Sequence, residues 1–132
     1  MKVFLDTNVL ASALATRGLC AELFEAVLVE HELLASEALL EELFSILMAK
    51  LGTPCEVAAA YVQLLRDTAT LVEAAGTLPA GIPDPDDAPL VAAAVAAEAC
   101  FVTGDKALLA WGETVGLPIL SPRQFWERTR FL

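Results

Sequence analysis

Four acidic side chains that are far apart in the chain stand beside predicted strand ends or on predicted helices. They are Asp6, Glu42, Asp87 and Asp105. In open α/β sheets, ligands bind at the carboxyl ends of the strands, where the connecting loops converge. Two carboxylates about 5 Å apart repel each other by roughly 3 kcal/mol at an effective dielectric constant of 20. A divalent cation removes this repulsion, so the four acids together predict a metal site.

A divalent cation in an all-oxygen site suits the hydrolysis of phosphodiesters. Mg²⁺ prefers oxygen ligands, retains water molecules and is commonly held by one or two carboxylates together with a substrate phosphate. The ion activates water, polarises the phosphoryl group and stabilises the departing oxygen, and a second ion shares these tasks. The sequence leaves open whether one or two ions bind. His31, at a predicted helix-to-strand junction, is a poor general-base candidate and is interpreted as a surface or junction residue.

Each acid also has a purely structural interpretation. Aspartate is favoured in Asx turns and at helix N-caps, which would account for Asp6, Asp87 and Asp105 separately. Glu42 would then be one more solvated helix residue. Three of these acids, however, fall at strand ends or helix starts on the same side of one predicted sheet. This shared side favours a common site.

The choice between Glu41 and Glu42 rests on helical geometry. At 100° per residue both lie about equally far from the centre of the apolar stripe of their helix. Glu42 shares its flank with Ala38, Ile46 and Ala49, which are small or apolar. A carboxylate on that flank is expected to be partly buried, so Glu42 is preferred.

Polar and basic residues accompany the acids. Thr7, Asn8 and Thr103 are expected either to orient carboxylates, water or phosphate, or to form local turn bonds. Lys106, next to Asp105, would meet a substrate phosphate or be a solvated helix residue. Arg17 is open to the same two interpretations.

Strand-like and helix-like segments alternate along the chain. Short apolar runs predict strands at about 2–6, 32–35, 70–73, 100–103 and 118–120. Periodic apolar residues and capping residues predict helices around 19–28, after Ser36, from the apparent capping box Thr53-Pro54-Cys55-Glu56 to about 68, after Asp86-Asp87, from Asp105 and after Ser121-Pro122. The segment 76–85 is expected to be a loop. This alternation predicts a three-layer α/β/α sandwich with a central, mainly parallel sheet of four to five strands.

Composition sets further bounds. With 132 residues and 14.0 kDa, residues 1–132 are expected to form one domain. Its apolar runs fall well short of the roughly 20 residues of a membrane span, and no export signal is evident, so no membrane association is expected. Three cysteines leave one over in any pairing, which favours the reducing cytoplasm. A net charge of -10 argues against a broad basic nucleic-acid surface but allows a short, local contact.

Several motifs taken together resemble a known family. They are Leu5-Asp6-Thr7-Asn8-Val9-Leu10, the helix acid followed by Leu43, Asp84-Pro85-Asp86-Asp87 leading into Leu90 and Ala92-Ala93-Ala94, Thr103-Gly104-Asp105-Lys106, and Ile119-Leu120-Ser121-Pro122 before Phe125. In this order the chain resembles a PIN domain, in particular the toxin branch related to VapC-type ribonucleases.

The resemblance implies an α/β/α sandwich in which Asp6, Glu42, Asp87 and Asp105 bind Mg²⁺ or Mn²⁺ and cleave RNA. Asp87 is preferred to Asp86 because it directly precedes the apolar helix pattern, as the family's acid does, and Asp86 stays open. The resemblance also implies a homodimer and a cognate antitoxin that occupies the active-site groove. Ala107 departs from the pattern, since many relatives have a further acid there, which puts a second metal site in doubt.

Three functional hypotheses follow. The leading one is a metal-dependent endoribonuclease that is the toxin of a toxin-antitoxin pair. The alternative is a non-catalytic PIN-fold module that binds RNA or protein. A third, a phosphotransfer receiver domain, is disfavoured because the pair of adjacent acids expected after the first strand is missing. Trp111, Phe125 and Trp126 are expected in the core or an interface, and exposed apolar helix faces would suit a dimer or a partner helix.

Overall fold

The strands of the sheet are all parallel, so their carboxyl ends lie at one edge, where the acids were predicted. A computed structural model describes residues 1–130 of the chain. Its five strands pair in the order β3-β2-β1-β4-β5. Their bounds are β1 (Lys2–Leu5), β2 (Glu32–Ala35), β3 (Thr70–Leu71), β4 (Cys100–Val102) and β5 (Ile119–Leu120). The central strands are continuous apolar runs, as expected where helices cover both faces.

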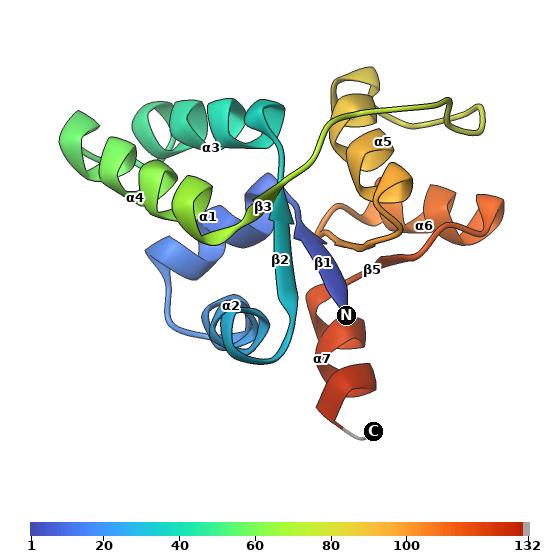
Figure 1. Cartoon of the computed structure of the whole chain (residues 1–132), viewed down its shortest axis with the longest axis horizontal. Coiled ribbons are helices and arrows are strands. Elements are labelled where there is room, and N and C mark those ends of the chain that lie inside the picture. The colour runs from blue at the N-terminus through green and yellow to red at the C-terminus, as the bar shows by residue number, and fades with distance from the viewer. Residues whose placement is uncertain (131–132) are drawn as a thin grey trace.

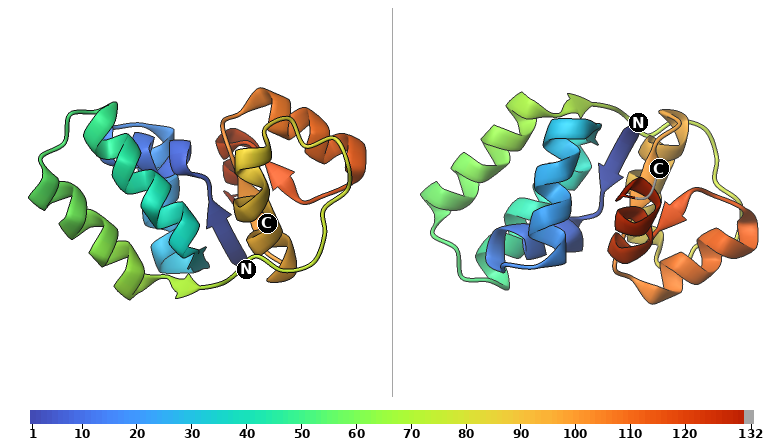
Figure 2. Two further views of the ribbon diagram at one scale, coloured as in Figure 1. Left: turned by 90° about the horizontal axis from the view of Figure 1, so that it is seen from above. Right: turned by 90° about the horizontal axis from the view of Figure 1, so that it is seen from below.

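Helices cover the sheet on both sides. They are α1 (Thr7–Ala15), α2 (Leu19–Glu30), α3 (Glu37–Ala49), α4 (Cys55–Thr68), α5 (Ala88–Ala96), α6 (Lys106–Val115) and α7 (Pro122–Arg130), with a 3₁₀ turn η1 (Pro85–Asp87) before α5. Figures 1 and 2 show α3 and α4 on one side of β1, and α5 and α6 on the other. The predicted three-layer sandwich with a parallel sheet is confirmed.

Two local predictions were incomplete or wrong. No helix was predicted between the first strand and residue 19, but α1 begins at Thr7, because Asp6 serves as its N-cap. The capping box predicted at Thr53 does not form. Pro54 occupies the N-cap position of α4 without a side-chain bond. Thr53 is held elsewhere, since its N–H donates to the Leu47 carbonyl at the end of α3, at 2.9 Å.

Other predicted helix starts are confirmed. The Ser36 hydroxyl accepts from the N–H of Leu39 at 3.2 Å and caps α3. At α7, Ser121 and Gln124 exchange two bonds, from Gln124 N–H to Ser121 Oγ (3.1 Å) and from Ser121 N–H to Gln124 Oε1 (2.9 Å). This reciprocal pair satisfies N–H groups that the first helical turn would otherwise leave free.

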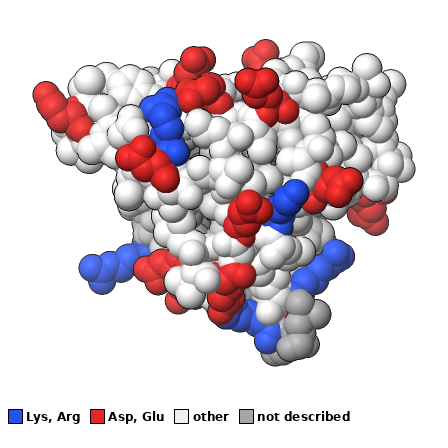
Figure 3. Space-filling model, in the orientation of Figure 1, with Lys and Arg blue, Asp and Glu red and all other residues white. Residues whose placement is uncertain are grey.

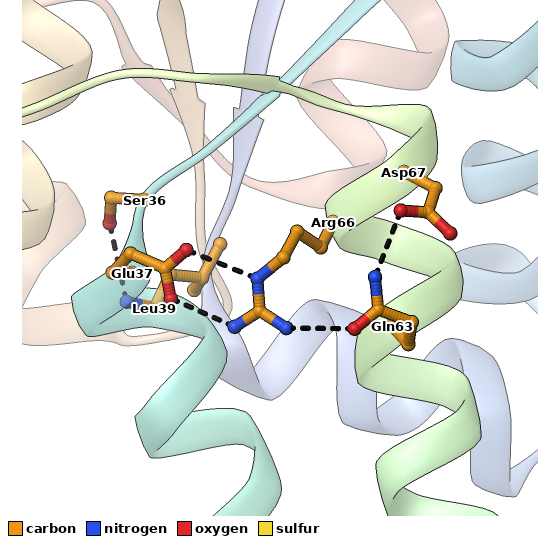
Figure 4. A network of polar contacts seen from close by, with 6 residues as sticks. All are labelled: Ser36, Glu37, Leu39, Gln63, Arg66 and Asp67. Carbon is orange, nitrogen blue, oxygen red and sulfur yellow. Dashed lines mark hydrogen bonds and ion pairs between the residues drawn. The ribbon is translucent and has the colours of Figure 1, made fainter.

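An ion pair and a close packing contact each connect two neighbouring elements. The Arg66 guanidinium forms two bonds to the Glu37 carboxylate, from Nε (3.1 Å) and Nη2 (2.8 Å), which join the start of α3 to α4 (Figure 4). Across the sheet, α6 packs so closely on β5 that a Cβ at Gly112 would lie 2.8 Å from Ile119 Cδ1. Trp111 and Phe125 are buried in the core, and Trp126 is partly buried against it, as expected.

Two further observations concern membrane-spanning helices and the cysteines. Among the helices of residues 1–130, none has both the length and the apolar character needed to cross a membrane. Cys20, Cys55 and Cys100 are free thiols, and of these only Cys100 is fully buried.

Candidate functional site

Asp6 lies at the carboxyl edge of the central strand and starts the adjacent helix. Its backbone N–H continues the pairing of β1 with β4 by donating to the Val102 carbonyl at 2.8 Å. Its side chain is buried, and Oδ1 accepts from the N–H of Thr7 at 2.8 Å. Asp6 is therefore both an N-cap of α1 and a carboxylate fixed in the middle of the edge.

Thr103 joins Asp6 to Asp105 through one buried hydroxyl. Thr103 is 0% exposed, and its Oγ1 donates to Asp6 Oδ2 at 2.7 Å. The same oxygen accepts from the N–H of Asp105 at 3.1 Å and from Asn8 Nδ2 at 3.4 Å. We call Asp6, Asn8, Thr103 and Asp105 the Thr103 cluster. Its hydrogen bonds set the positions of two carboxylates relative to each other.

Asn8 completes the Thr103 cluster. Its Nδ2 donates to Asp6 Oδ2 at 3.3 Å, and its Oδ1 accepts from the N–H of Gly104 at 3.1 Å. One amide thus ties the start of α1 to the loop after β4. Asn8 and Thr103 therefore form hydrogen bonds between two elements, in addition to any local turn bonds of the kind that the alternative interpretation proposed.

Asp105 has a capping role as well. Its Oδ1 accepts from the N–H groups of Ala107 (2.9 Å) and Leu108 (3.1 Å) and so caps α6. These bonds leave Oδ2 outside the cap. The structural and the site interpretations of Asp105 therefore concern different oxygens of one carboxylate.

Asp87 experiences the charges of the other acids. Its pKa is raised to about 6, first by burial and then by the negative charges of Asp6, Asp84, Glu42 and Asp105. The pKa of Asp6 is also raised, chiefly by its burial, although the bond from Thr103 opposes the shift. The charges of the other three predicted acids therefore act on Asp87 at one edge of the sheet, which we call the acidic edge and which comprises Asp6, Glu42, Asp84, Asp87 and Asp105.

The structure also distinguishes Glu42 from Glu41 and Asp87 from Asp86. Glu42 is half-buried, whereas Glu41 is exposed and lines a groove between α3 and α4. Asp87 is half-buried and Asp86 is exposed. Asp86 is not among the charges that raise the pKa of Asp87, but Glu42 is. These findings favour Glu42 and Asp87 without testing either as a ligand.

Asp84 was not among the predicted site residues, and the burial of Thr7 was not predicted. Asp84 caps η1, its Oδ1 accepting from the N–H of Asp86 at 2.9 Å, and its charge raises the pKa of Asp87. The Asp-Pro-Asp-Asp run was a signal that a second acid precedes the helix. Thr7 is 1% exposed, and its hydroxyl has no hydrogen-bond partner within residues 1–130.

The remaining candidates divide by position. Lys106 is exposed at the first position of α6, directly after Asp105. Arg17 follows α1, whose nine residues lead away from the acidic edge by about 13 Å. His31 precedes β2 and therefore lies at the opposite edge, where its ring packs edge-on against Phe125 with the ring centres 5.4 Å apart. The structure thus brings Lys106, but neither Arg17 nor His31, to the acids.

The donor chemistry of the acidic edge fits a hard divalent cation. The acids supply carboxylate oxygens, which Mg²⁺ prefers, while Asn8 and Thr103 donate hydrogen bonds to Asp6. Within residues 1–130, however, no group of three or more His, Cys, Asp or Glu side chains is close enough together to form a complete metal site. A cation here would fit as one held by few carboxylates, with water or phosphate completing its shell.

Comparisons with known proteins find similarity over most of the chain. The family model for the PIN domain matches residues 2–107. Among solved structures, VapBC2 from Rickettsia felis bound to a DNA fragment from its promoter is similar, with 15% identity, a TM-score of 0.66 and coverage of 92% of this chain and 98% of that chain. VapBC-1 from nontypeable Haemophilus influenzae has 16% identity, a TM-score of 0.64 and coverage of 93% and 99%. No curated protein matches the chain.

Proposed function

The chain belongs to the PIN-domain family, and on that premise we propose that it is a metal-dependent endoribonuclease that hydrolyses RNA phosphodiester bonds. The observation that carries the proposal is the acidic edge, where Asp6 is fixed by Thr103 and the other acids raise the pKa of Asp87. Uncompensated carboxylates at the carboxyl ends of parallel strands are costly unless a cation binds there.

Asp6, Glu42, Asp87 and Asp105 would hold Mg²⁺ or Mn²⁺. When bound, the cation supplies charge neutralisation at the phosphate and activation of the attacking water. Asn8 and Thr103 keep the Asp6 carboxylate in one orientation, since they donate to the same oxygen at 3.3 and 2.7 Å. Lys106, which is exposed beside these acids, would contact a neighbouring phosphate.

We also propose a toxin role in the cytoplasm, with a cognate antitoxin and a homodimer as partners. Two of the similar solved structures are VapBC proteins. A groove of about 460 Å³ between α3 and α4 has Leu40, Phe44 and Val62 in its lining, and Val57 and Leu64 are exposed on α4. This apolar surface suits a partner helix.

Light scattering of the purified chain tests the dimer. Growth arrest on expression of the wild-type chain, relieved by Asp6→Asn, tests the toxin role.

The decisive experiment is cleavage of labelled single-stranded RNAs with Mg²⁺, Mn²⁺ or EDTA. Wild-type protein is expected to cleave only with metal, and Asp6→Asn and Asp105→Asn are expected to abolish cleavage. Asn is itself a good N-cap, so both variants should keep their helices, which circular dichroism checks. RNA or protein binding without cleavage under any metal would instead support the non-catalytic module.

Neighbouring acids provide matched controls. Glu42→Gln and Asp87→Asn should reduce cleavage strongly, while Glu41→Gln and Asp86→Asn, which remove equal charge from exposed positions, should retain it. Equal loss within either pair would mean that general charge, rather than the acidic edge, governs activity.

A further inference from the structure

A second hollow begins beside the acidic edge and follows the open side of the sheet. It is a groove of about 770 Å³ along β5, the last strand of the sheet, between α6 and α7. Lys106 and Glu113 of α6 form one wall, Arg123 and Arg128 of α7 form the other, and Ile119 and Leu120 lie between them. Because α6 and α7 directly follow β4 and β5, Lys106 and Arg123 lie at the carboxyl edge, where the acids also lie.

The backbone of β5 is poorly suited to pairing with another strand. Two N–H groups on its open side are already bonded, that of Ile119 to the Leu117 carbonyl (2.8 Å) and that of Ser121 to Gln124 Oε1 (2.9 Å). A strand added to a sheet edge needs such donors. The walls of the groove, and not its backbone, are therefore the surface offered to a ligand.

The walls of the groove concentrate positive charge in an acidic protein. Three of the chain's eight basic residues line the groove, against the two acids Glu113 and Glu127. None of the three basic side chains forms an ion pair within residues 1–130, whereas Arg66 and Arg130 are paired with Glu37 and Glu30. In the view of Figure 3, acidic side chains lie along the upper border of the molecule and also in its lower half, where most of the visible basic side chains lie. A polyanion that reaches the acids meets unpaired cations in the groove.

We propose that this groove binds the single-stranded RNA on one side of the cleaved bond, with Arg123 and Arg128 contacting backbone phosphates. The inference rests on the proposed ribonuclease function and adds to it the path of the strand. Arg123 stands at the start of α7 and Arg128 follows about 1.4 turns further along, a rise of about 7.5 Å, so successive phosphates meet successive cations. Cation contacts to phosphate are independent of base sequence, so the groove contributes affinity without specifying the target.

The test uses binding, separately from cleavage. A fluorescein-labelled single-stranded RNA of about 12 nucleotides, within the range of single-strand site sizes, is titrated with the Asp6→Asn protein in Mg²⁺ buffer and followed by anisotropy. In that background, Arg123→Gln and Arg128→Gln should each weaken binding about 3- to 10-fold. Each should also reduce the slope of log affinity against log salt by about 0.7. Arg17→Gln, which removes an exposed charge after α1, should change neither quantity.

The outcomes separate this inference from the proposed function. If the Arg123 and Arg128 variants bind as Arg17→Gln does, or if no variant binds RNA, the inference is wrong even where wild-type protein cleaves. If the two arginines contribute as expected while wild-type protein cleaves nothing, the groove binds RNA and the nuclease proposal fails. Displacement of the RNA by poly-glutamate as readily as by poly-uridylate would assign the groove to an acidic protein segment and overturn the RNA assignment.

Discussion

Thr103→Val tests whether the Thr103 cluster holds a buried charge. The substitution replaces the hydroxyl by a methyl group of similar size, and the site is 0% exposed, so solvent cannot substitute for the lost bonds. It removes the 2.7 Å bond to the Asp6 carboxylate and leaves the Asp105 N–H without its 3.1 Å acceptor. A hydrogen bond to a charged group contributes about 1.5–3 kcal/mol, so Thr103→Val should lower the free energy of unfolding by about 2–3 kcal/mol at pH 7.5.

The same variant carries a pH signature. Burial already raises the pKa of Asp6 in the folded state, and the Thr103 bond opposes that rise. Ionisation of Asp6 therefore destabilises the folded protein as pH rises from about 3.8 through the folded pKa, and Thr103→Val should enlarge this loss. The difference from wild type should be large at pH 7.5 and smaller near pH 4.

Urea unfolding in EDTA, followed by circular dichroism at both pH values, measures this difference. Thr103→Ser keeps the hydroxyl and loses one methyl group, so it should cost only about 1 kcal/mol, with no added pH dependence. The reasoning about a charge-assisted bond is refuted if Thr103→Val is as stable as wild type at pH 7.5, or if its deficit is the same at both pH values.

Three further predictions concern single side chains. Asp87→Asn should stabilise the metal-free protein by about 1 kcal/mol at pH 7.5, a value discounted for the solvent exposure of Asp87, and by less near pH 4. The reason is that a pKa of about 6 disfavours the ionised form of Asp87 in the folded state. Equal effects in thermal melts at both pH values would contradict this. Gly112→Ala should cost about 1–3 kcal/mol through contact with Ile119, and Ile119→Val should partly restore the melting temperature. Iodoacetamide should label exposed Cys55 first and Cys100, whose burial raises its thiol pKa to about 11, only on unfolding, as mass spectrometry would show.

The fold was largely predictable because its strands are short apolar runs and its helices carry clear capping residues. Ser36 illustrates this, since its hydroxyl forms the predicted bond to Leu39 N–H. Thr53 fitted a capping pattern equally well, but the backbone bond from its N–H to the Leu47 carbonyl, six residues earlier, holds it in the turn after α3. A four-residue pattern cannot register such a competing contact. Similarly, Thr7 and Asn8 were interpreted as orienting residues or as local turn residues, although polar residues also occupy the first turn of a helix.

The site was predictable to the level of its elements. A parallel sheet places the residues after β1 and β4 at one edge, so the proximity of Asp6 and Asp105 follows from topology alone. The role of Thr103 does not follow, because a hydroxyl that bonds within its own turn and one that bridges two loops have the same sequence signature. The contribution of Asp84 and the basic lining of the β5 groove depend on the paths of loops and helices, which periodicity does not specify.

The acids of the acidic edge differ in how firmly the protein fixes them. Asp6 and Asp105 each cap a helix, so backbone N–H groups hold their carboxylates and the positive ends of α1 and α6 offset part of their charge. Glu42 and Asp87, in contrast, make no side-chain hydrogen bond within residues 1–130; Glu42 lies on α3, and Asp87 is the last residue of η1. Because no side-chain hydrogen bond holds them, Glu42 and Asp87 are the side chains that we expect to move when a cation binds.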